Sequence, residues 1–337
     1  MRLLVMSHLA AALAAVPAVG AHAEDGGARE PVDGPVLTAI SENDFYAQSG
    51  DRNYTAGQKG VYLSGPLGQG SFAAGISRAL FGDEGDRDVR QSFAIGQSIF
   101  TADDITVAEP LPDQRPYAGW LYAEYSVLSQ NYRGADVVTM QAGVVGSSAQ
   151  GEAVQNLWHD LIAGPRAQGW DNQIDDEVAI NVSYDHMWRP RRIFGGDRFA
   201  ADWSPSAGAD FGNVRIDAHA GMTFRIGRGL KNDYGPPRIA PALGGVAYVA
   251  PRSRFGWHLF AGMEGRAVVH DIFLDGSLFR RGDPSVPSRV FVGDFQGGIV
   301  LQFRKTQFTY TYVHRTREFD GQFDPQKFGS LSLSRRF

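Results

Sequence analysis

Apolar and polar residues alternate along most of the chain, which is the pattern of strands that bury one face. In the segment 307–315, Phe308, Tyr310 and Tyr312 fall on one side, and Thr309 and Thr311 fall on the other. Similar segments predict strands near residues 36–45, 54–65, 91–101, 117–132, 136–147, 177–190, 206–214, 216–227, 239–250, 256–273, 288–304, 307–320 and 327–337. Strands this long, separated by polar turns, are typical of a transmembrane barrel rather than a soluble sandwich. We therefore predict an all-β fold, a closed antiparallel transmembrane β-barrel of about 12 strands.

The two ends of the chain place this barrel in an outer membrane. Arg2, the apolar run that follows it and the small residues "AHA" at 21–23 form a secretory signal peptide over residues 1–23. Residues 24–35 are rich in Gly, Pro and charge and are expected to form a flexible leader, so the barrel domain spans 36–337. The chain stops on Phe337 at the end of an alternating segment, as outer-membrane barrels often do. We expect export to the bacterial outer membrane.

Composition agrees with a barrel and excludes other classes. The chain has 41 glycines and 12% aromatic residues, which are abundant at barrel bends and in interfacial girdles. It has no cysteine, so no disulfide stabilises it. Apart from the signal peptide, no apolar run approaches the roughly 18 residues of a spanning helix. The net charge of −5 becomes −6 once Arg2 is removed, so the overall charge does not favour nucleic-acid binding.

One segment has helical rather than strand periodicity. Its apolar residues recur at i, i+3, i+4, i+7 and i+8: Val154, Leu157, Trp158, Leu161 and Ile162. Ser147 or Ser148 can cap the start of this helix, and Gly164-Pro165 ends it. Gln155 and His159 are four residues apart and share one side. A barrel has little structural need for such a helix, so we expect it to pack against the rim or wall and to serve function.

A second polar group lies in "SENDFYAQSGDRNYTAG", residues 41–57. Turn-forming residues account for its middle, but not for Asn43 and Asp44 at one end or Thr55 at the other. Because such groups are costly against lipid, we expect Asn43, Asp44 and His159 to face the lumen or a cleft at the rim. Imidazole is a general base near neutral pH, and a carboxylate with nearby oxygens can hold calcium. The residue types suit ester hydrolysis.

Several motifs resemble those of one family. "SENDFY", "DRNYTAG", "GQSIFTADDI", "RPYAGWLY" and the helical segment 153–173 occur in the order found in the lipid A 3′-O-deacylase family of outer-membrane proteins. The resemblance covers most of the first half of the mature chain. It implies a twelve-stranded barrel whose active site lies between the wall and a helix. It also implies calcium-dependent removal of the 3′-linked acyloxyacyl group of lipid A.

The resemblance also assigns residues. The family's Asn-Asp pair falls on Asn43 and Asp44, its hydroxyl on Thr55, and its helical Gln and His on Gln155 and His159. We predict that His159 activates water and that calcium at Asp44 stabilises the oxyanion. Asn43 would orient the site or donate to the oxyanion, and Thr55 would complete the polar network. The ends of the 41–57 stretch would then lie on adjacent antiparallel strands, opposite His159.

The chain departs from the family at one position. Some members carry an acid six residues beyond the helical His, where this chain has Pro165. Other ligands for calcium must therefore come from elsewhere or from backbone carbonyls. Asp171, Asp175 and Glu177 are near in sequence, and the sequence does not place them.

Two further residues are candidates for substrate contact. Arg115 and Tyr117 could bind the phosphate or sugar of lipid A, since guanidinium suits phosphate. The same residues could instead begin a strand of the aromatic belt. The expected partners are lipid A or lipopolysaccharide and outer-membrane lipids, with no nucleic acid, for a monomeric protein. Two alternatives stay open: a phospholipase-type acyl hydrolase with a Ser nucleophile, and a non-catalytic, porin-like barrel.

Overall fold

The computed structural model describes residues 34–47, 52–82, 87–162, 164–196, 199–230 and 255–337. Its strands are β1 (Val36–Asn43), β2 (Asn53–Leu63), β3 (Asp88–Thr101), β4 (Ala118–Gln130), β5 (Gly134–Val145), β6 (Glu177–Trp188), β7 (Arg191–Gly195), β8 (Ala200–Gly212), β9 (Arg215–Arg228), β10 (Phe255–Asp271), β11 (Phe291–Phe303), β12 (Thr306–Arg315) and β13 (Gln326–Arg336). Its helices are α2 (Phe72–Phe81), α3 (Gly151–Ile162) and α4 (Ile272–Asp275), with short 3-10 turns η1 (Asp44–Tyr46), η2 (Ser147–Ala149) and η3 (Gly169–Asn172).

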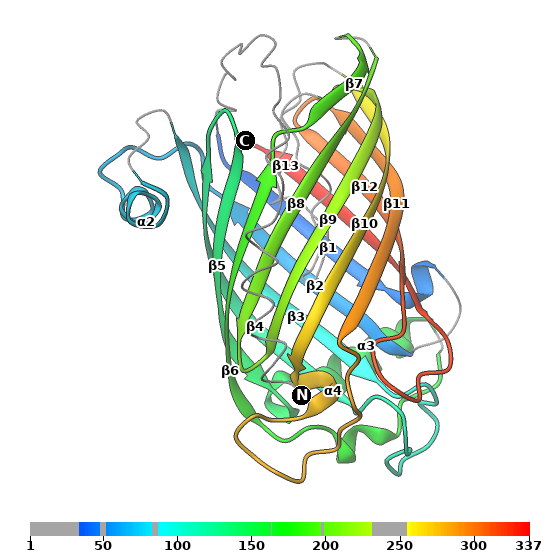
Figure 1. Ribbon diagram of the computed structural model, residues 1–337. Coiled ribbons are helices and arrows are strands. Elements are labelled where there is room, and N and C mark those ends of the chain that lie inside the picture. The colour runs from blue at the N-terminus through cyan, green and yellow to red at the C-terminus, as the bar shows by residue number, and fades with distance from the viewer. Residues whose placement is uncertain (1–33, 48–51, 83–86, 163, 197–198, 231–254) are drawn as a thin grey trace. The chain divides into compact units, whose positions relative to one another are not determined.

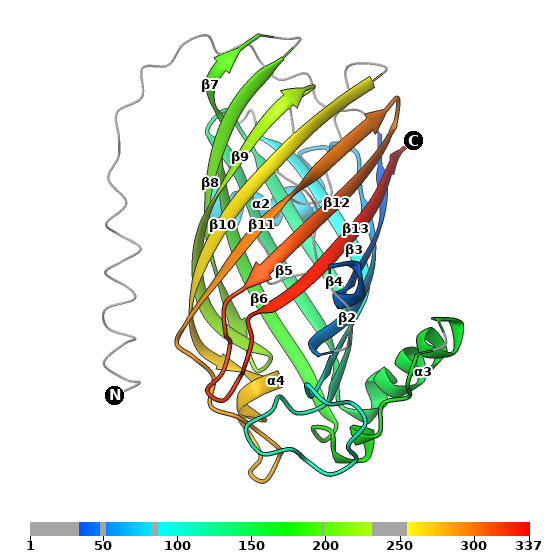
Figure 2. The same cartoon turned by 90° about the vertical axis from the view of Figure 1, so that its right-hand side faces the viewer.

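Twelve of these strands form a closed antiparallel ring, as predicted (Figure 1). The first and last strands pair, with Val36 opposite Arg336 and Asn43 opposite Gly329. The ring also closes between β6 and β8, where Asn181 lies opposite Gly212. Closure pairs both edges of each strand of the ring and so removes the open edges that promote aggregation. The C-terminus and β7 lie toward one end of the barrel, and α3 and α4 lie toward the other (Figure 2).

The outer and inner faces of the strands follow the alternation in the sequence. Leu37, Phe93 and Ile95 point outward and are 48%, 49% and 68% exposed, as lipid-facing residues should be. Inward residues such as Thr309 and Thr311 are buried. The predicted two-sided pattern of these strands is therefore confirmed.

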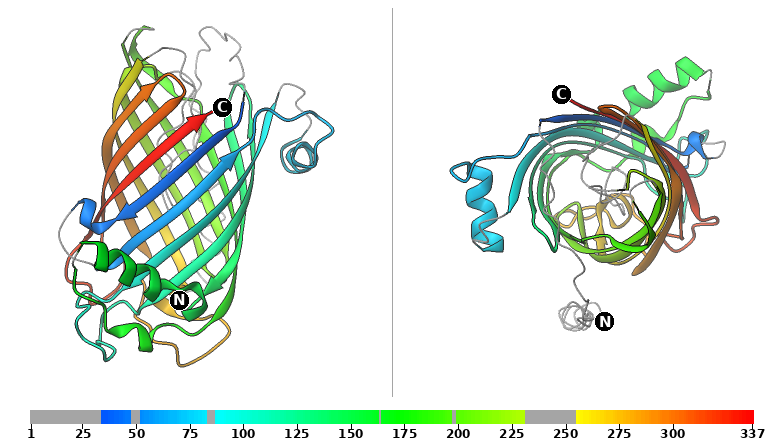
Figure 3. Two further views of the ribbon diagram at one scale, coloured as in Figure 1. Left: turned by 180° about the vertical axis from the view of Figure 1, so that it is seen from behind. Right: turned by 90° about the horizontal axis from the view of Figure 1, so that it is seen from above.

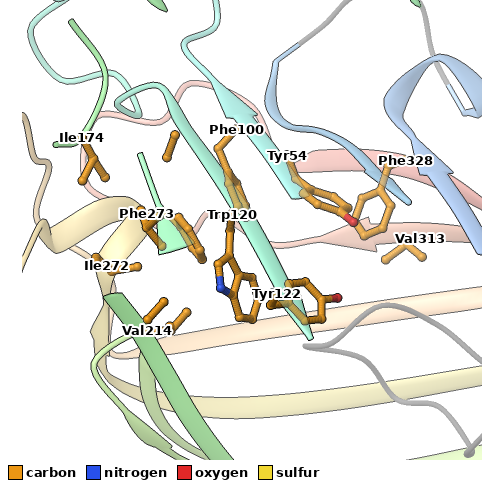
Figure 4. Packing of buried hydrophobic residues seen from close by; sticks show 13 residues of the cluster. Tyr54, Phe100, Trp120, Tyr122, Ile174, Val214, Ile272, Phe273, Val313 and Phe328 are labelled. Carbon is orange, nitrogen blue, oxygen red and sulfur yellow. The ribbon is translucent and has the colours of Figure 1, made fainter. Parts of the chain in front are cut away.

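The interior is filled at the end near α3 by a cluster of aromatic and aliphatic side chains (Figure 4). Phe273 of α4 stacks on Phe100 of β3, with ring centroids 4.1 Å apart. Trp120 and Tyr122 of β4 stack on each other at the same separation, and both are almost fully buried. These rings pack against one another inside the ring of strands at this end.

The structure contains elements that the sequence pattern did not predict. β7 is an added strand that pairs with the part of β8 beyond its pairing with β6, in a stretch for which no strand was predicted. α2 and the single turn α4 were not predicted either. The strand predicted at 239–250 lies outside the described residues. Within the described ranges, no helix has the length and apolar character needed to cross a membrane.

Candidate active site

A cavity of about 230 Å³ lies between α3 and the outward faces of β1, β2 and β3. α3 lies outside the ring of strands and across its wall (Figure 3). Four of the predicted site residues line this cavity: Asn43, Thr55, Gln155 and His159. The rest of the lining is largely apolar and includes Ala56, Ile99, Val154, Leu157 and Trp158. The structure thus brings together residues from the 41–57 stretch and from the helix, such as Thr55 and Gln155, which are 100 positions apart in sequence.

Two glycines allow α3 to approach the wall closely. A Cβ added to Gly151, the first residue of α3, would lie 2.5 Å from Cη2 of Trp170 and 3.2 Å from Cα of Gly119 in β4. The preceding turn is fixed to the wall because Gln97 Nε2 of β3 donates to the Ala149 carbonyl at 2.6 Å. Neither Ser147 nor Ser148 caps α3 as predicted. Both bind Asp176 instead.

His159 is buried at 2% exposure, and a backbone contact fixes its orientation. Its Nδ1 bonds to the carbonyl oxygen of Pro165. Since a carbonyl oxygen can only accept, Nδ1 carries the proton, and in the neutral ring Nε2 carries the lone pair. The residue that stands where some family members have an acid therefore orients the imidazole through its backbone.

Gln155, one turn earlier on α3, is held by an indole. Its Oε1 accepts a 2.8 Å hydrogen bond from Nε1 of Trp170, a buried residue of η3. Trp170 packs edge-on against Tyr117, with ring centroids 5.2 Å apart. Trp170 was not among the predicted site residues. Its position in "GWDNQ" is the sequence signal that could have suggested it.

The strand residues of the site are placed by local backbone geometry. Asn43 Oδ1 accepts from the backbone N of Phe45 at 2.8 Å and so caps η1. The pairing of β2 with β3 shifts register between Tyr54 and Ala56, and the bulged residue between them is Thr55. Bulges of this kind redirect side chains beside active sites. Thr55 Oγ1 shares a 2.7 Å hydrogen bond with Oγ1 of Thr101 on β3, a residue that sequence reasoning did not single out.

Comparison with known proteins identifies the family of the chain. The family model described as outer membrane protein LpxR matches residues 4–337. The chain belongs to the LpxR family. It is an outer-membrane β-barrel, and the resemblance stated from its motifs is confirmed.

Two solved structures are similar to this LpxR family member. LpxR from Salmonella typhimurium matches with a TM-score of 0.72 and 19% identity, covering 90% of this chain and 100% of that chain. The β domain of the Bordetella autotransporter BrkA matches with a TM-score of 0.43 and 10% identity, covering 91% of this chain and 100% of that chain. A comparison with curated protein sequences finds no match.

Asp44 lies beside the cavity rather than in its lining. It is fully buried at the start of η1, and its Oδ2 accepts from the backbone N of Arg52 at 2.8 Å. Asn53, the next residue, is 2% exposed, and its Nδ2 donates to Oδ1 of Asp103 at 2.9 Å. Burial raises the pKa of the Asp103 carboxyl, against the lowering effect of Arg52.

The sequence left two positions open for the polar site residues: the lumen or a cleft at the rim. Asn43 and His159 do not face the lumen; they lie on the outer side of the wall, where α3 covers them. The expected rim cleft is the position observed. The covering helix is what removes the cost of polar groups on the lipid side.

Arg115 and Tyr117 are not brought to this cavity. They line a second cavity, with residues 107–114 and 284–286 among its walls. The Arg115 guanidinium is buried and donates to Oε2 of Glu318 at 2.7 Å. Their contact with substrate stays a prediction that this position does not support.

The acids near the helix in sequence also lie elsewhere. The carbonyl of Asp175 accepts from Arg280, and the Glu177 carboxylate pairs with the same guanidinium at 3.3 Å. Asp171 is exposed in η3. None of these three residues lines the cavity beside His159.

Proposed function

We propose that this protein is a calcium-dependent ester hydrolase that removes the 3′-linked acyloxyacyl group of lipid A. The observation that carries the proposal is the place of the cavity: a buried His opens into a largely apolar pocket on the outer wall of a membrane barrel. A lipid substrate could reach such a site from within the membrane. A water-soluble substrate would gain nothing from that position.

His159 acts as the general base. Its Nδ1–H is held by the Pro165 carbonyl, so Nε2 takes a proton from water. The resulting hydroxide attacks the ester carbonyl carbon. The bond from this carbon to the 3′ oxygen then breaks, and the proton passes from Nε2 to that oxygen. The products are a free acid and a hydroxyl at the 3′ position.

The neighbouring polar residues stabilise and orient the reacting groups. Asn43 uses Oδ1 to cap η1, so its amide N–H groups serve as donors to the oxyanion. Thr55, fixed by Thr101, completes the polar wall opposite the helix. Gln155 is fixed by its hydrogen bond from Trp170, and it holds the face of α3 that carries His159 in place.

The oxygen atoms beside the cavity fit calcium. Asp44 supplies a carboxylate that burial removes from water. Asn53 Oδ1 is buried and makes no hydrogen bond among the described residues. The preceding residue, Arg52, donates its backbone N–H to Oδ2 of Asp44. Carboxylate and amide oxygens are the ligands that calcium takes in proteins. Asp44, with Asn53 and Asp103, would hold the ion, and calcium there would polarise the ester carbonyl.

The apolar lining supports an acyl substrate. Val154 and Leu157 of α3 face the strand residues Ala56 and Ile99 across the cavity. Leu157 is 63% exposed, which suits contact with lipid chains at the mouth.

The aromatic cluster in the lumen favours an enzyme over the porin-like alternative. Phe100, Trp120 and Phe273 fill the interior near the site, where a passive pore would need an open path. The phospholipase alternative would use the same cavity with another lipid and a Ser nucleophile, so the identity of the released acid separates it from the proposal.

Purified protein in mixed micelles tests the proposal. Lipid A and phospholipid are supplied together, with calcium or after chelation, and released acids are identified by mass spectrometry. The proposal predicts release of the 3′ acyloxyacyl group with calcium only, and loss of release in His159→Asn. Release of phospholipid acids alone would favour the second hydrolase, and no release from folded wild type would contradict both.

A further inference from the structure

A group of metal-binding side chains lies on the inner wall of the barrel, far from the cavity in the strand order. Asp210 of β8 and Asp217 and His219 of β9 each offer one ligand atom, and these atoms lie within 4.8 Å of one another. We propose that these three residues bind a divalent transition metal, with zinc as the best fit. This proposal is independent of the proposed hydrolase activity.

The distances suit one ion. His219 Nδ1 lies 3.0 Å from Oδ1 of Asp217 and 3.9 Å from Oδ2 of Asp210. Two ligands about 2.1 Å from a tetrahedral zinc are separated by about 3.4 Å, and the observed values bracket this separation. One imidazole and two carboxylates are ligands that zinc accepts, and a water would complete the shell. The chain has no cysteine, so nitrogen and oxygen must form any zinc site.

The surroundings hold these ligands in the orientation that a metal needs. His219 Nε2 lies 2.9 Å from Oδ1 of Asp185 on β6, so the ring can donate there while Nδ1 binds the ion. A carboxylate on the second nitrogen is the usual support of a metal-binding His. Asp210 is oriented through its other oxygen, since Oδ1 accepts from Nδ2 of Asn181 at 2.9 Å.

An unsatisfied oxygen within the cluster points independently to a ligand. Asp217 is 3% exposed, and its Oδ2 makes no hydrogen bond among the described residues. Nε of Arg215 forms an ion pair with this oxygen at 3.8 Å, which is beyond hydrogen-bond distance. A buried carboxylate oxygen without a hydrogen bond is costly, and a bound cation would remove that cost.

A glycine leaves room for the His219–Asp185 contact. A Cβ added to Gly208, which faces His219 across the β8–β9 pair, would lie 2.5 Å from Nε2 of His219 and 2.6 Å from Oδ1 of Asp185. A side chain there would separate the two partners. The absence of a side chain at Gly208 therefore permits the contact that orients the imidazole.

The location gives the ion a structural role. β6 pairs with β8 where the ring closes, and β7 leaves the ring between them. An ion held by Asp210 and His219 would connect β8 to β9, and Asp185 would add β6. The metal would fasten the three strands around this closure.

Zinc binding to the detergent-solubilised, chelator-treated full chain tests the proposal. Zinc chloride is added, the stoichiometry is measured by mass spectrometry of the metal, and affinity is measured against a chromophoric chelator. We expect one zinc per chain in wild type. Wild type that takes up no zinc would overturn the proposal and leave a protonated His219 bridging the aspartates.

Variants locate the ion. Asp217→Asn and His219→Gln should abolish stoichiometric binding, and Asp185→Asn should weaken affinity by about 10–100-fold. Asp202→Asn, another lumen carboxylate that pairs with Arg225 instead, should bind like wild type. His159→Gln should lose deacylation but keep zinc, which separates this site from the proposed catalytic one. Unchanged binding in Asp217→Asn would contradict the assignment.

X-ray absorption of zinc-loaded wild type covers the case in which variants do not fold. The proposal predicts a shell of nitrogen and oxygen with one imidazole per zinc. A spectrum without imidazole would place the ion elsewhere and overturn it.

Discussion

Replacing Gly151 with alanine should disturb the proposed active site, although Gly151 does not line the cavity. Gly151 begins α3, and an added Cβ would come within 2.5 Å of Cη2 and 2.9 Å of Cζ3 of Trp170. Real Cβ contacts are not this short, so either the indole or α3 must move. The indole also holds Gln155, and the helix carries His159, so either movement reaches the cavity.

The size of the effect follows from packing and from positioning. Overpacking of a close contact costs about 1–3 kcal/mol of folding stability. A displacement near 1 Å of a catalytic group lowers the rate by about 100-fold. We therefore expect Gly151→Ala to lose modest stability and most of its deacylation rate.

Gly75→Ala in α2 is the matched control. An added Cβ at Gly75 meets no atom within 4 Å, so alanine should gain about 0.5–1 kcal/mol from helix propensity and leave the rate unchanged. Stability is measured by urea unfolding in micelles, and rate by release of acid from lipid A. Wild-type stability and rate in Gly151→Ala would refute the close packing of α3 on the wall.

Three other substitutions test the supports around the site. Trp170→Phe removes the hydrogen bond to Gln155 and should cost about 0.5–1.5 kcal/mol, with a lower rate constant measured at saturating lipid A. Arg115→Gln leaves a buried carboxylate with one cation fewer and should destabilise the barrel by up to about 3–5 kcal/mol; a higher KM at unchanged stability would instead mark a substrate contact. Hydrogen bonds from Ser148 lower the pKa of Asp176. The ionised carboxylate therefore stabilises the turn before α3 fully above the usual aspartate pKa, and this stabilisation is lost as pH falls through the lowered pKa. Amide exchange at neutral pH should be faster in that turn in Asp176→Ala.

The ring of strands could be predicted because each strand carries its own period-two signal. Segments such as 307–315 alternate lipid-facing aromatics with buried threonines, and the two faces meet different surroundings. β7 could not be predicted in this way because all of its residues are exposed, so no alternation marks it. α4 is a single turn, too short for a helical period.

The candidate site was predictable where residue type and spacing act together. Gln155 and His159 share a helix face at four-residue spacing, and both line the cavity. Their partners were harder to predict. The Pro165 carbonyl has no side-chain signature, and Trp170 has only its position in "GWDNQ" to distinguish it from a core aromatic residue. The outward position of the site depends on α3 folding back across the wall, which strand alternation does not encode.

The most direct test of the account is mass spectrometry of lipid A from cells that carry the wild type or His159→Asn, with wild-type membranes also assayed in calcium and after chelation. The account predicts loss of the 3′ acyloxyacyl mass with wild type in calcium, and intact lipid A after chelation and in the variant. Deacylation that persists in a folded His159→Asn barrel would contradict it.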